Sequence, residues 1–241
     1  MRLAAALALI ALGGCGAGDE RLIVSAAASL AEPLTACSRD FTGADVRLSF
    51  AGSDELAAQI RQGVRPDVYA AANAALPDQL AREGLLGEPV EFATNELVVA
   101  VPAGGAGVAS LEGLAEPGVK LVVGAESVPV GSYTLELLGR LPAAEERAIL
   151  ANVRSEEPDV RGVVGKLAQG AADAGFVYRT DVAGTDLEAV EIEPALQPRV
   201  AYGAGVVDGA PQPEAARRYL DGLTGGACAA ALRDAGFGPP P

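Results

Sequence analysis

Residues 46–62 read Val-Arg-Leu-Ser-Phe-Ala-Gly-Ser-Asp-Glu-Leu-Ala-Ala-Gln-Ile-Arg-Gln. The first six residues are typical of a β-strand, and Gly52 and Ser53 follow them directly. Leu56, Ile60 and Val64 then fall on one face of a helix. The stretch therefore predicts a strand that turns through a glycine and a serine into an amphipathic helix.

The same order of strand and helix repeats along the chain. Strands are predicted at 22–27, 46–51, 67–71, 96–101, 120–124, 175–178, 190–193 and 200–207. Helices are predicted at 30–41, 54–62, 76–83, 132–141, 143–152, 160–169, 213–223 and 227–235. Such alternation indicates an α/β fold with largely parallel sheets.

Two predicted strands differ from the others because each follows a polar or proline-rich break. They are Glu96–Val101 and Val200–Val207, and we expect them to cross between two lobes. The first lobe would contain residues 22–94 and 201–241, and the second would contain residues 95–200. Two lobes joined by two crossings form a hinge with a ligand cleft between them.

Composition excludes several classes of function. The 241 residues are 50% hydrophobic, carry a net charge of −14 and include no histidine. A chain this acidic has no basic surface for nucleic acid. Without histidine it has no Ser-His-Asp or Cys-His pair and no histidine-containing zinc site. The chain is also too apolar to be disordered.

The N-terminus has the features of an export signal. One arginine, an apolar run from Leu3 to Leu12 and two glycines precede Cys15. Leu12-Gly-Gly-Cys15 resembles a bacterial lipobox, which predicts a lipoprotein signal peptide over 1–14, a lipidated Cys15 and a tether over 15–21. The alternative is a plain signal peptide in which the cysteine has no role. Export also makes a disulfide between Cys37 and Cys228 possible, with two free thiols as the alternative.

Four predicted helices begin in a way that suits an anion. Ser29 with Glu32 matches a capping box, and Ser53 follows a strand in the same way. Pro129 and Gly131, in Val128-Pro-Val-Gly, mark the start of a third helix. Asp159 is expected to cap a fourth helix, which begins at Val160. Each start leaves free backbone N–H groups and a partial positive charge. Several starts aimed at one point would hold an anion without any charged side chain, although a single start is ordinarily just a cap.

Several segments, in this order, resemble the molybdate-binding proteins of ABC importers, the ModA family. They are Ser-Ala-Ala-Ala-Ser-Leu (25–30), Ser-Phe-Ala-Gly-Ser (49–53), Leu-Ala-Ala-Gln-Ile (56–60) with Gly63, Pro-Asp-Val-Tyr-Ala-Ala (66–71), Asn-Glu-Leu-Val-Val (95–99), Val-Pro-Val-Gly-Ser-Tyr (128–133), Asp-Val-Arg (159–161), Ala-Asp-Ala-Gly-Phe-Val-Tyr (172–178) and Gly-Phe (236–237). The resemblance implies a two-lobed, type II periplasmic-binding-protein-like fold with the ligand cleft between the lobes.

The same resemblance implies an exported, monomeric binding protein that is not an enzyme and has no cofactor. It would deliver molybdate or tungstate to an ABC importer permease. The lipobox at Cys15 predicts that the protein is lipid-anchored to the outer face of the bacterial cell membrane, with a periplasmic protein as the alternative. Molybdenum would be present only within the bound oxyanion.

Residue by residue, the resemblance implies five ligand contacts. Hydroxyl and N–H groups would come from Ser29 and Ser53, backbone N–H groups from Val130 and Val160, and a phenol from Tyr178. The family usually has alanine where Val130 stands, which leaves the N–H in place. Asp54 is expected to face solvent, since a carboxylate in the cleft would oppose the anion. Tyr178 could instead be a core residue with its hydroxyl at the surface.

Other oxyanions are the nearest alternative ligands. Binding proteins for sulfate or phosphate share the two-lobed fold, so the fold alone does not exclude them. Molybdate is larger than sulfate, and a protonated phosphate would meet donors with no acceptor. A secreted lipoprotein hydrolase is a remote alternative, because neither Ser29 nor Ser53 lies in a Gly-x-Ser-x-Gly motif.

Overall fold

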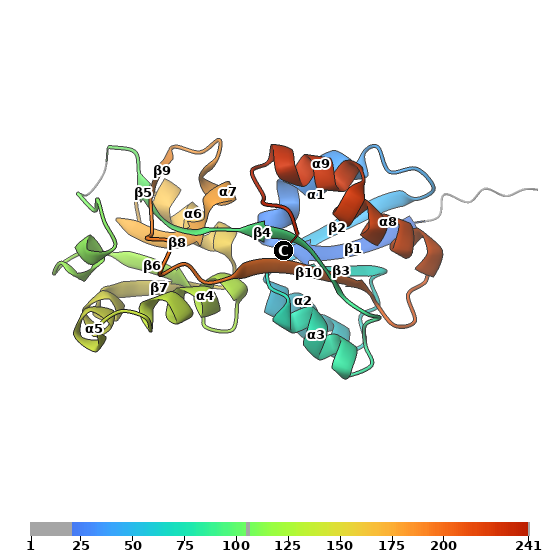
Figure 1. Cartoon of the computed structure of the whole chain (residues 1–241), viewed down its shortest axis with the longest axis horizontal. Coiled ribbons are helices and arrows are strands. Elements are labelled where there is room, and N and C mark those ends of the chain that lie inside the picture. The colour runs from blue at the N-terminus through green and yellow to red at the C-terminus, as the bar shows by residue number, and fades with distance from the viewer. Residues whose placement is uncertain (1–20, 105–106, 241) are drawn as a thin grey trace, which may run out of the picture.

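The computed structural model describes residues 21–104 and 107–240. Within these residues two five-stranded sheets, each with its own helices, lie side by side (Figure 1). The first lobe is the sheet of strand order β2-β1-β3-β10-β4 with its helices, and the second is the sheet of order β7-β6-β8-β5-β9 with its helices. The two-lobed α/β fold expected from the sequence is confirmed.

The first lobe places helices on both faces of its sheet. Its strands are β1 (Arg21–Ala27), β2 (Asp45–Ala51), β3 (Val68–Ala71), β4 (Val90–Asn95) and β10 (Val200–Val206). Its helices are the 3-10 turn η1 (Ala28–Leu30), α1 (Ala31–Ser38), α2 (Ser53–Arg61), α3 (Ala75–Arg82), α8 (Pro213–Gly225) and α9 (Ala227–Asp234). In Figure 1, α2 and α3 lie below the sheet and α1, α8 and α9 lie above it. Strand β3 is therefore buried along its whole length.

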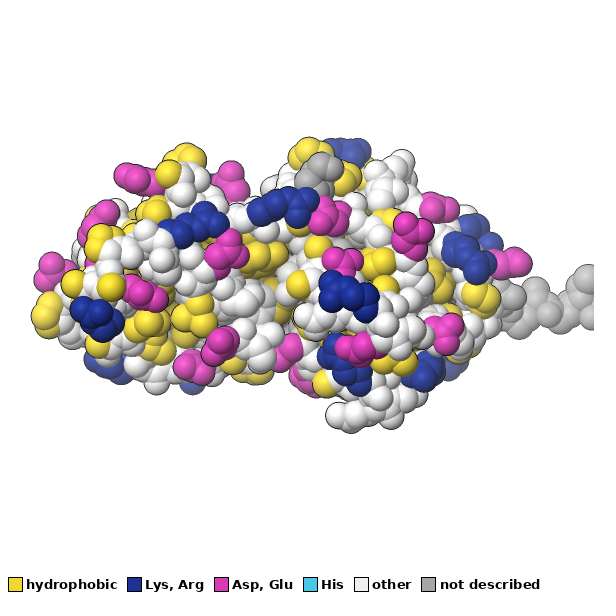
Figure 2. All heavy atoms as spheres, turned by 60° about the horizontal axis from the view of Figure 1, so that its bottom comes forward, with side chains coloured by type: hydrophobic (Ala, Val, Ile, Leu, Met, Phe, Trp, Pro, Cys, Tyr) yellow, Lys and Arg dark blue, Asp and Glu magenta, His cyan; other side chains and the backbone are white. Residues whose placement is uncertain are grey.

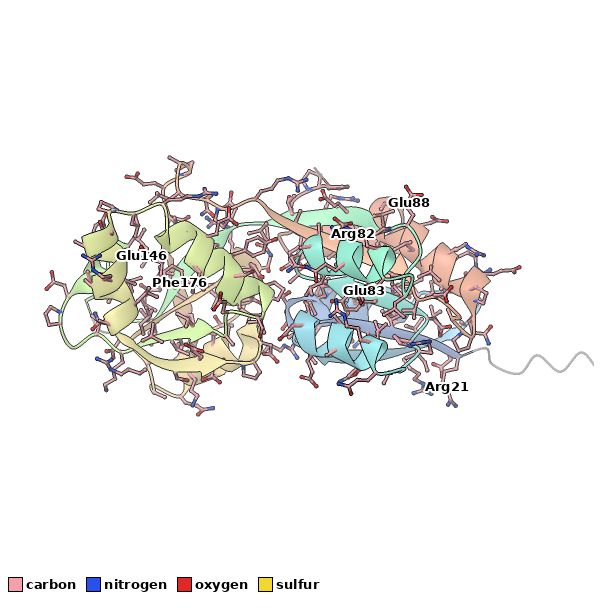
Figure 3. All side chains as sticks on the ribbon, turned by 90° about the horizontal axis from the view of Figure 1, so that it is seen from below. Arg21, Arg82, Glu83, Glu88, Glu146 and Phe176 are labelled. Carbon is pink, nitrogen blue, oxygen red and sulfur yellow. A yellow bond between two sulfur atoms is a disulfide. The ribbon has the colours of Figure 1, made fainter. Side chains whose placement is uncertain are left out.

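The second lobe follows the same plan. Its strands are β5 (Leu97–Pro102), β6 (Leu121–Gly124), β7 (Val153–Glu157), β8 (Ala174–Tyr178) and β9 (Leu187–Val190). Its helices are η2 (Glu112–Ala115), α4 (Pro129–Leu138), α5 (Ala143–Ala151), α6 (Val160–Ala168) and α7 (Arg179–Val182). Phe176 of β8 is fully buried and lies in the interior of this lobe in Figure 3. Helices α4 and α6 both pack on β6 and β8. These two central strands are therefore buried along their whole length.

Two connections join the lobes. A single residue, Glu96, separates β4 of the first sheet from β5 of the second, and residues 191–199 lead from β9 back to β10. The limits of the lobes proposed from the sequence, 22–94 with 201–241 and 95–200, stay a prediction.

The expectation of largely parallel sheets is wrong. Strand β10 runs antiparallel to β3 and β4, and β5 runs antiparallel to β8 and β9. The pairs of β1 with β2 and β3, and of β6 with β7 and β8, are parallel. The difference has a simple cause, because β5 and β10 each enter a sheet from the other lobe rather than through a helical crossover within it.

Some predicted element bounds also need correction. Strands β4 and β7 were not expected, and β9 lies at Leu187–Val190 instead of 190–193. In β7 partly buried residues alternate with exposed ones at the edge of the sheet, so it lacks the apolar run that marks the central strands. Helix α4 begins at Pro129, three residues before the predicted start, because proline is favoured at the first helical position.

A disulfide fastens the C-terminal helices to the first lobe. Cys37 of α1 and Cys228 of α9 are bonded, with their Cα atoms 4.9 Å apart and a separation of 191 positions in sequence. In the chain-entropy account, closing so long a loop stabilises by about 5 kcal/mol. The predicted signal peptide and Cys15 lie outside the described residues. Within the part of the chain that is described, none of the helices is long and apolar enough to cross a membrane.

Candidate functional site

A small pocket lies between the lobes, where elements of both sheets end. Its empty space is about 230 Å³ including the mouth, which is below the size usual for pockets that hold organic ligands. All five residues predicted as ligand contacts line it together: Ser29, Ser53, Val130, Val160 and Tyr178. The structure thus brings together positions that are up to 149 residues apart, from Ser29 to Tyr178.

Three of the five residues stand at helix starts. Ser53 is the first residue of α2, Val160 is the first residue of α6 and Val130 is the second residue of α4. Backbone N–H groups in the first turn have no partner within their own helix. The positive ends of the three helix dipoles therefore meet at one small volume, which favours a negative charge there.

Ser53 is held so that its hydroxyl proton is available. The side chain is 2% exposed, and its Oγ accepts a hydrogen bond from the Ala72 N–H at 3.1 Å. The Ser53 carbonyl accepts from the Tyr69 hydroxyl at 2.7 Å, which fixes the backbone as well. Because Ala72 supplies a proton to Oγ, the proton of Ser53 itself is free to point into the pocket.

Ser29 does not form the capping box predicted from the sequence. The residues that precede η1 and α1 are Ala27 and Leu30, and neither helix has a side-chain cap. The Ser29 hydroxyl instead lies 3.1 Å from the hydroxyl of Tyr202. The capping box fails because the chain enters α1 through the 3-10 turn η1, so Ser29 already lies inside a helical turn.

Tyr178 carries an unpaired donor. The residue is 1% exposed, and its hydroxyl is buried without a hydrogen-bond partner among the described residues. Burial, more than any neighbouring group, raises the pKa of this phenol well above its usual value, so the hydroxyl keeps its proton. The alternative of a hydroxyl at the surface is wrong. A buried donor without a partner costs about 1–3 kcal/mol, which a ligand in the pocket would offset.

Two carboxylate residues lie at the pocket: Asp159 is one of its lining residues, and Asp54 follows the lining residue Ser53. Asp159 caps α6, as expected, by accepting from the Gly162 N–H at 3.0 Å. Asp54 lies in the first turn of α2 and is only partly exposed to solvent, and its Oδ2 accepts from the Ser127 hydroxyl of the second lobe at 2.7 Å. Its Oδ1 is buried without a partner among the described residues. The hydrogen bond between Asp54 and Ser127 therefore joins the two lobes beside the pocket.

The two lobes approach each other closely around Gly52. A Cβ atom at this position would lie 2.5 Å from the carbonyl oxygen of Pro158, which belongs to the second lobe. Only glycine allows the strand end of the first lobe to come this near. The two lobes are therefore in close contact at the edge of the pocket.

Neither lysine nor arginine lines the pocket within the described chain. On the face drawn in Figure 2, basic and acidic side chains are interspersed over both lobes. The described residues also lack any group of three or more acidic or cysteine side chains that could hold a metal ion. The hydrogen-bond donors available at the pocket are therefore backbone N–H groups at helix starts and side-chain hydroxyls.

The model of a protein family described as bacterial extracellular solute-binding protein matches residues 22–238. The chain belongs to that family. It is 36% identical over 231 residues to the molybdate-binding protein ModA of Mycobacterium tuberculosis H37Rv, covering 92% of this chain and 86% of that protein. The resemblance to the ModA proteins is thus confirmed, as is the expectation of a binding protein rather than an enzyme.

Two solved structures share the fold of this family member. The periplasmic molybdate-binding protein of Azotobacter vinelandii superposes with a TM-score of 0.79 at 21% identity, over 91% of this chain and 100% of that one. The sulfate-binding protein SubI of Mycobacterium tuberculosis H37Rv gives 0.80 at 16% identity, over 91% and 87%. The fold alone therefore does not choose between the two anions.

Sequence reasoning missed two groups around the site. Tyr202, behind Ser29, lies in a predicted strand with nothing in its pattern to mark it. The Asp54–Ser127 contact joins residues 73 positions apart in separate lobes. Neither contact has a local sequence signal, since both depend on how the lobes meet.

Proposed function

We propose that this protein binds molybdate, and tungstate with it, outside the bacterial cell membrane and delivers the anion to the permease of an ABC importer. The observation that carries the proposal is the pocket itself, where uncharged donors from both lobes converge in a relative of a molybdate-binding protein. Export, a lipid anchor at Cys15 and a monomeric state belong to the same proposal.

The proposed contacts follow from the geometry. Ser29 and Ser53 would donate from their hydroxyls and N–H groups, Val130 and Val160 from their N–H groups, and Tyr178 from its phenol. A dianion removed from water needs its lone pairs satisfied, because an unpaired buried charge is very costly. Hydrogen bonds to a charged acceptor are about twice as strong as those between neutral groups.

Selectivity would come mainly from size. Donors fixed by helix starts and by hydrogen bonds such as Ala72 N–H to Ser53 Oγ fit one ionic radius best. Molybdate and tungstate are nearly the same size, so both would bind, whereas the smaller sulfate would leave some donors unpaired. A protonated phosphate would bring a donor to the five proposed contacts, all of which are donors.

Isothermal calorimetry and thermal shift with molybdate, tungstate, sulfate and phosphate test the proposal. A ligand at 100 times its Kd stabilises the folded protein by about 2.7 kcal/mol. We expect that shift for molybdate and tungstate, and little or none for the other two at the same concentration. A shift with sulfate and none with molybdate would replace the proposal with the alternative ligand.

A further inference from the structure

Tyr202 stands where the two lobes join and reaches the ligand groups of both. It lies in β10, is fully buried and places its hydroxyl 3.1 Å from Ser29 Oγ of the first lobe. Its ring packs edge-on against that of Tyr178 of the second lobe, with the centroids 5.8 Å apart. Phe92 and Phe237 hold the ring from other sides, with centroids at 6.1 and 5.3 Å.

The direction of the hydrogen bond to Ser29 decides what Ser29 can do. Either hydroxyl could donate, but a phenol is more acidic than an alcohol and is therefore the better donor, and burial raises the pKa of the Tyr202 phenol, so that it keeps its proton. If Tyr202 donates to Ser29 Oγ, the proton of Ser29 must point elsewhere. Ser29 lines the pocket, and Tyr202 does not. In that arrangement the Ser29 hydroxyl can direct its proton into the pocket.

The arrangement repeats the one at Ser53. There the backbone N–H of Ala72 donates a hydrogen bond to Ser53 Oγ and leaves the serine proton for the pocket. At Ser29 the Tyr202 phenol would play the same part. Both hydroxyls would thus be aligned as donors before the anion arrives, which lowers the entropy lost on binding.

We propose that Tyr202 is a positioning residue of the anion site, which orients the Ser29 hydroxyl as a donor and supports the ring of Tyr178. The inference rests on the proposed function, because it assigns Tyr202 a part in holding that ligand. Tyr202 does not touch the anion. It acts through the two side chains that do.

The chain offers a matched control for this role. The hydroxyl of Tyr219 in α8 lies 3.0 Å from Ser38 Oγ, and its ring packs edge-on against Phe41. This is a buried tyrosine bonded to a serine, as at Tyr202, but neither Tyr219 nor Ser38 lines the pocket. Tyr219→Phe therefore measures what the loss of such a hydrogen bond costs the fold alone.

The experiment is a calorimetric titration of the mature protein with molybdate. Tyr202→Phe, Tyr219→Phe, Ser29→Ala and the double variant Tyr202→Phe/Ser29→Ala are compared with the wild type, and melting temperatures are recorded without ligand. We expect Tyr202→Phe to weaken binding about tenfold, and Tyr219→Phe to change it less than about twofold. The molybdate Kd of the double variant should lie within about twofold of that of Ser29→Ala, because the two groups act as one unit.

The outcomes separate the two proposals. Binding by the wild type with unchanged affinity in Tyr202→Phe would overturn the positioning role alone. Independent losses that multiply in the double variant would also overturn it, since Tyr202 would then act without Ser29. No binding of molybdate by the wild type would remove both the proposed function and the role of Tyr202. Similar melting temperatures for Tyr202→Phe and Tyr219→Phe would show that both variants are folded. A Tyr202→Leu variant that binds molybdate as tightly as the wild type would also contradict the proposal.

Discussion

The two lobes supply the pocket in different ways. The first lobe presents serine hydroxyls, each hydrogen-bonded to another group of the protein: Ser53 to the Ala72 N–H and Ser29 to the Tyr202 hydroxyl. The second lobe presents backbone N–H groups at the starts of α4 and α6, together with one phenol, Tyr178. One side therefore depends on particular side chains, and the other depends mainly on the path of the backbone.

This difference decides which substitutions matter. A hydroxyl donor is lost when its serine is replaced, whereas an N–H remains whatever side chain the residue carries. The second lobe should instead be sensitive at the residues that shape its helix starts, such as Gly131 in α4 and Asp159 before α6. The following predictions test this contrast, from the largest expected effect to the smallest.

Gly131→Ala should have the largest effect although it removes no donor. A Cβ atom at Gly131 would overlap the carbonyl oxygens of Gly124 and Ala125, so the start of α4 must shift. We expect molybdate affinity to fall more than about 100-fold, since misplaced donors lose charge-assisted hydrogen bonds. Calorimetry measures the loss. Gly165→Ala in α6 is the control, because its Cβ would meet nothing within 4 Å and should stabilise the helix by up to about 1 kcal/mol.

Ser53→Ala should weaken molybdate binding about 10- to 150-fold, as expected for a hydrogen bond of about 1.5–3 kcal/mol to a charged group. It also leaves the buried Ala72 N–H without its partner, so the melting temperature should fall. Ser132→Ala is the matched control, because that hydroxyl bonds to the Pro129 carbonyl at 2.9 Å. Val130→Ala keeps its N–H and should cost far less affinity than Ser53→Ala. Equal losses in these variants would contradict the contrast between the lobes.

Tyr178→Phe should separate binding from stability. The substitution removes a buried hydroxyl that has no partner among the described residues, so the ligand-free protein should melt at the same temperature or higher. Binding should weaken about tenfold, because the phenol is a donor only to the ligand. Thermal shift with and without molybdate measures both quantities. A lower melting temperature with unchanged affinity would make Tyr178 a core residue and nothing more.

Ser127→Ala should have the smallest effect. Its hydroxyl donates to Asp54 across the lobes at an exposed position, and exposed contacts of this kind contribute less than about 1 kcal/mol. We expect the molybdate Kd to rise by less than about fivefold, with Ser110→Ala as a control in the same lobe. A loss as large as that of Ser53→Ala would show that this contact governs lobe closure.

The sequence predicts those parts of the site that are marked by residues next to one another in the chain. The strand-to-helix turns predicted at Ser29 and Ser53 and the helix start predicted at Val160 all lie at the pocket. The antiparallel course of β5 and β10 could not be read locally, because it depends on chain crossings between lobes. The partner of Ser29 was missed for the same reason, since Tyr202 is 173 residues away.

Crystals grown with molybdate and measured at the molybdenum absorption edge would locate the anion directly. We predict one strong anomalous peak in the pocket between the lobes, with its oxygens about 2.7–3.2 Å from donors of Ser29, Ser53, Val130, Val160 and Tyr178. A peak in the neighbouring groove lined by Glu32, Arg161 and Asp181, or none at all, would contradict the assignment of this pocket as the binding site.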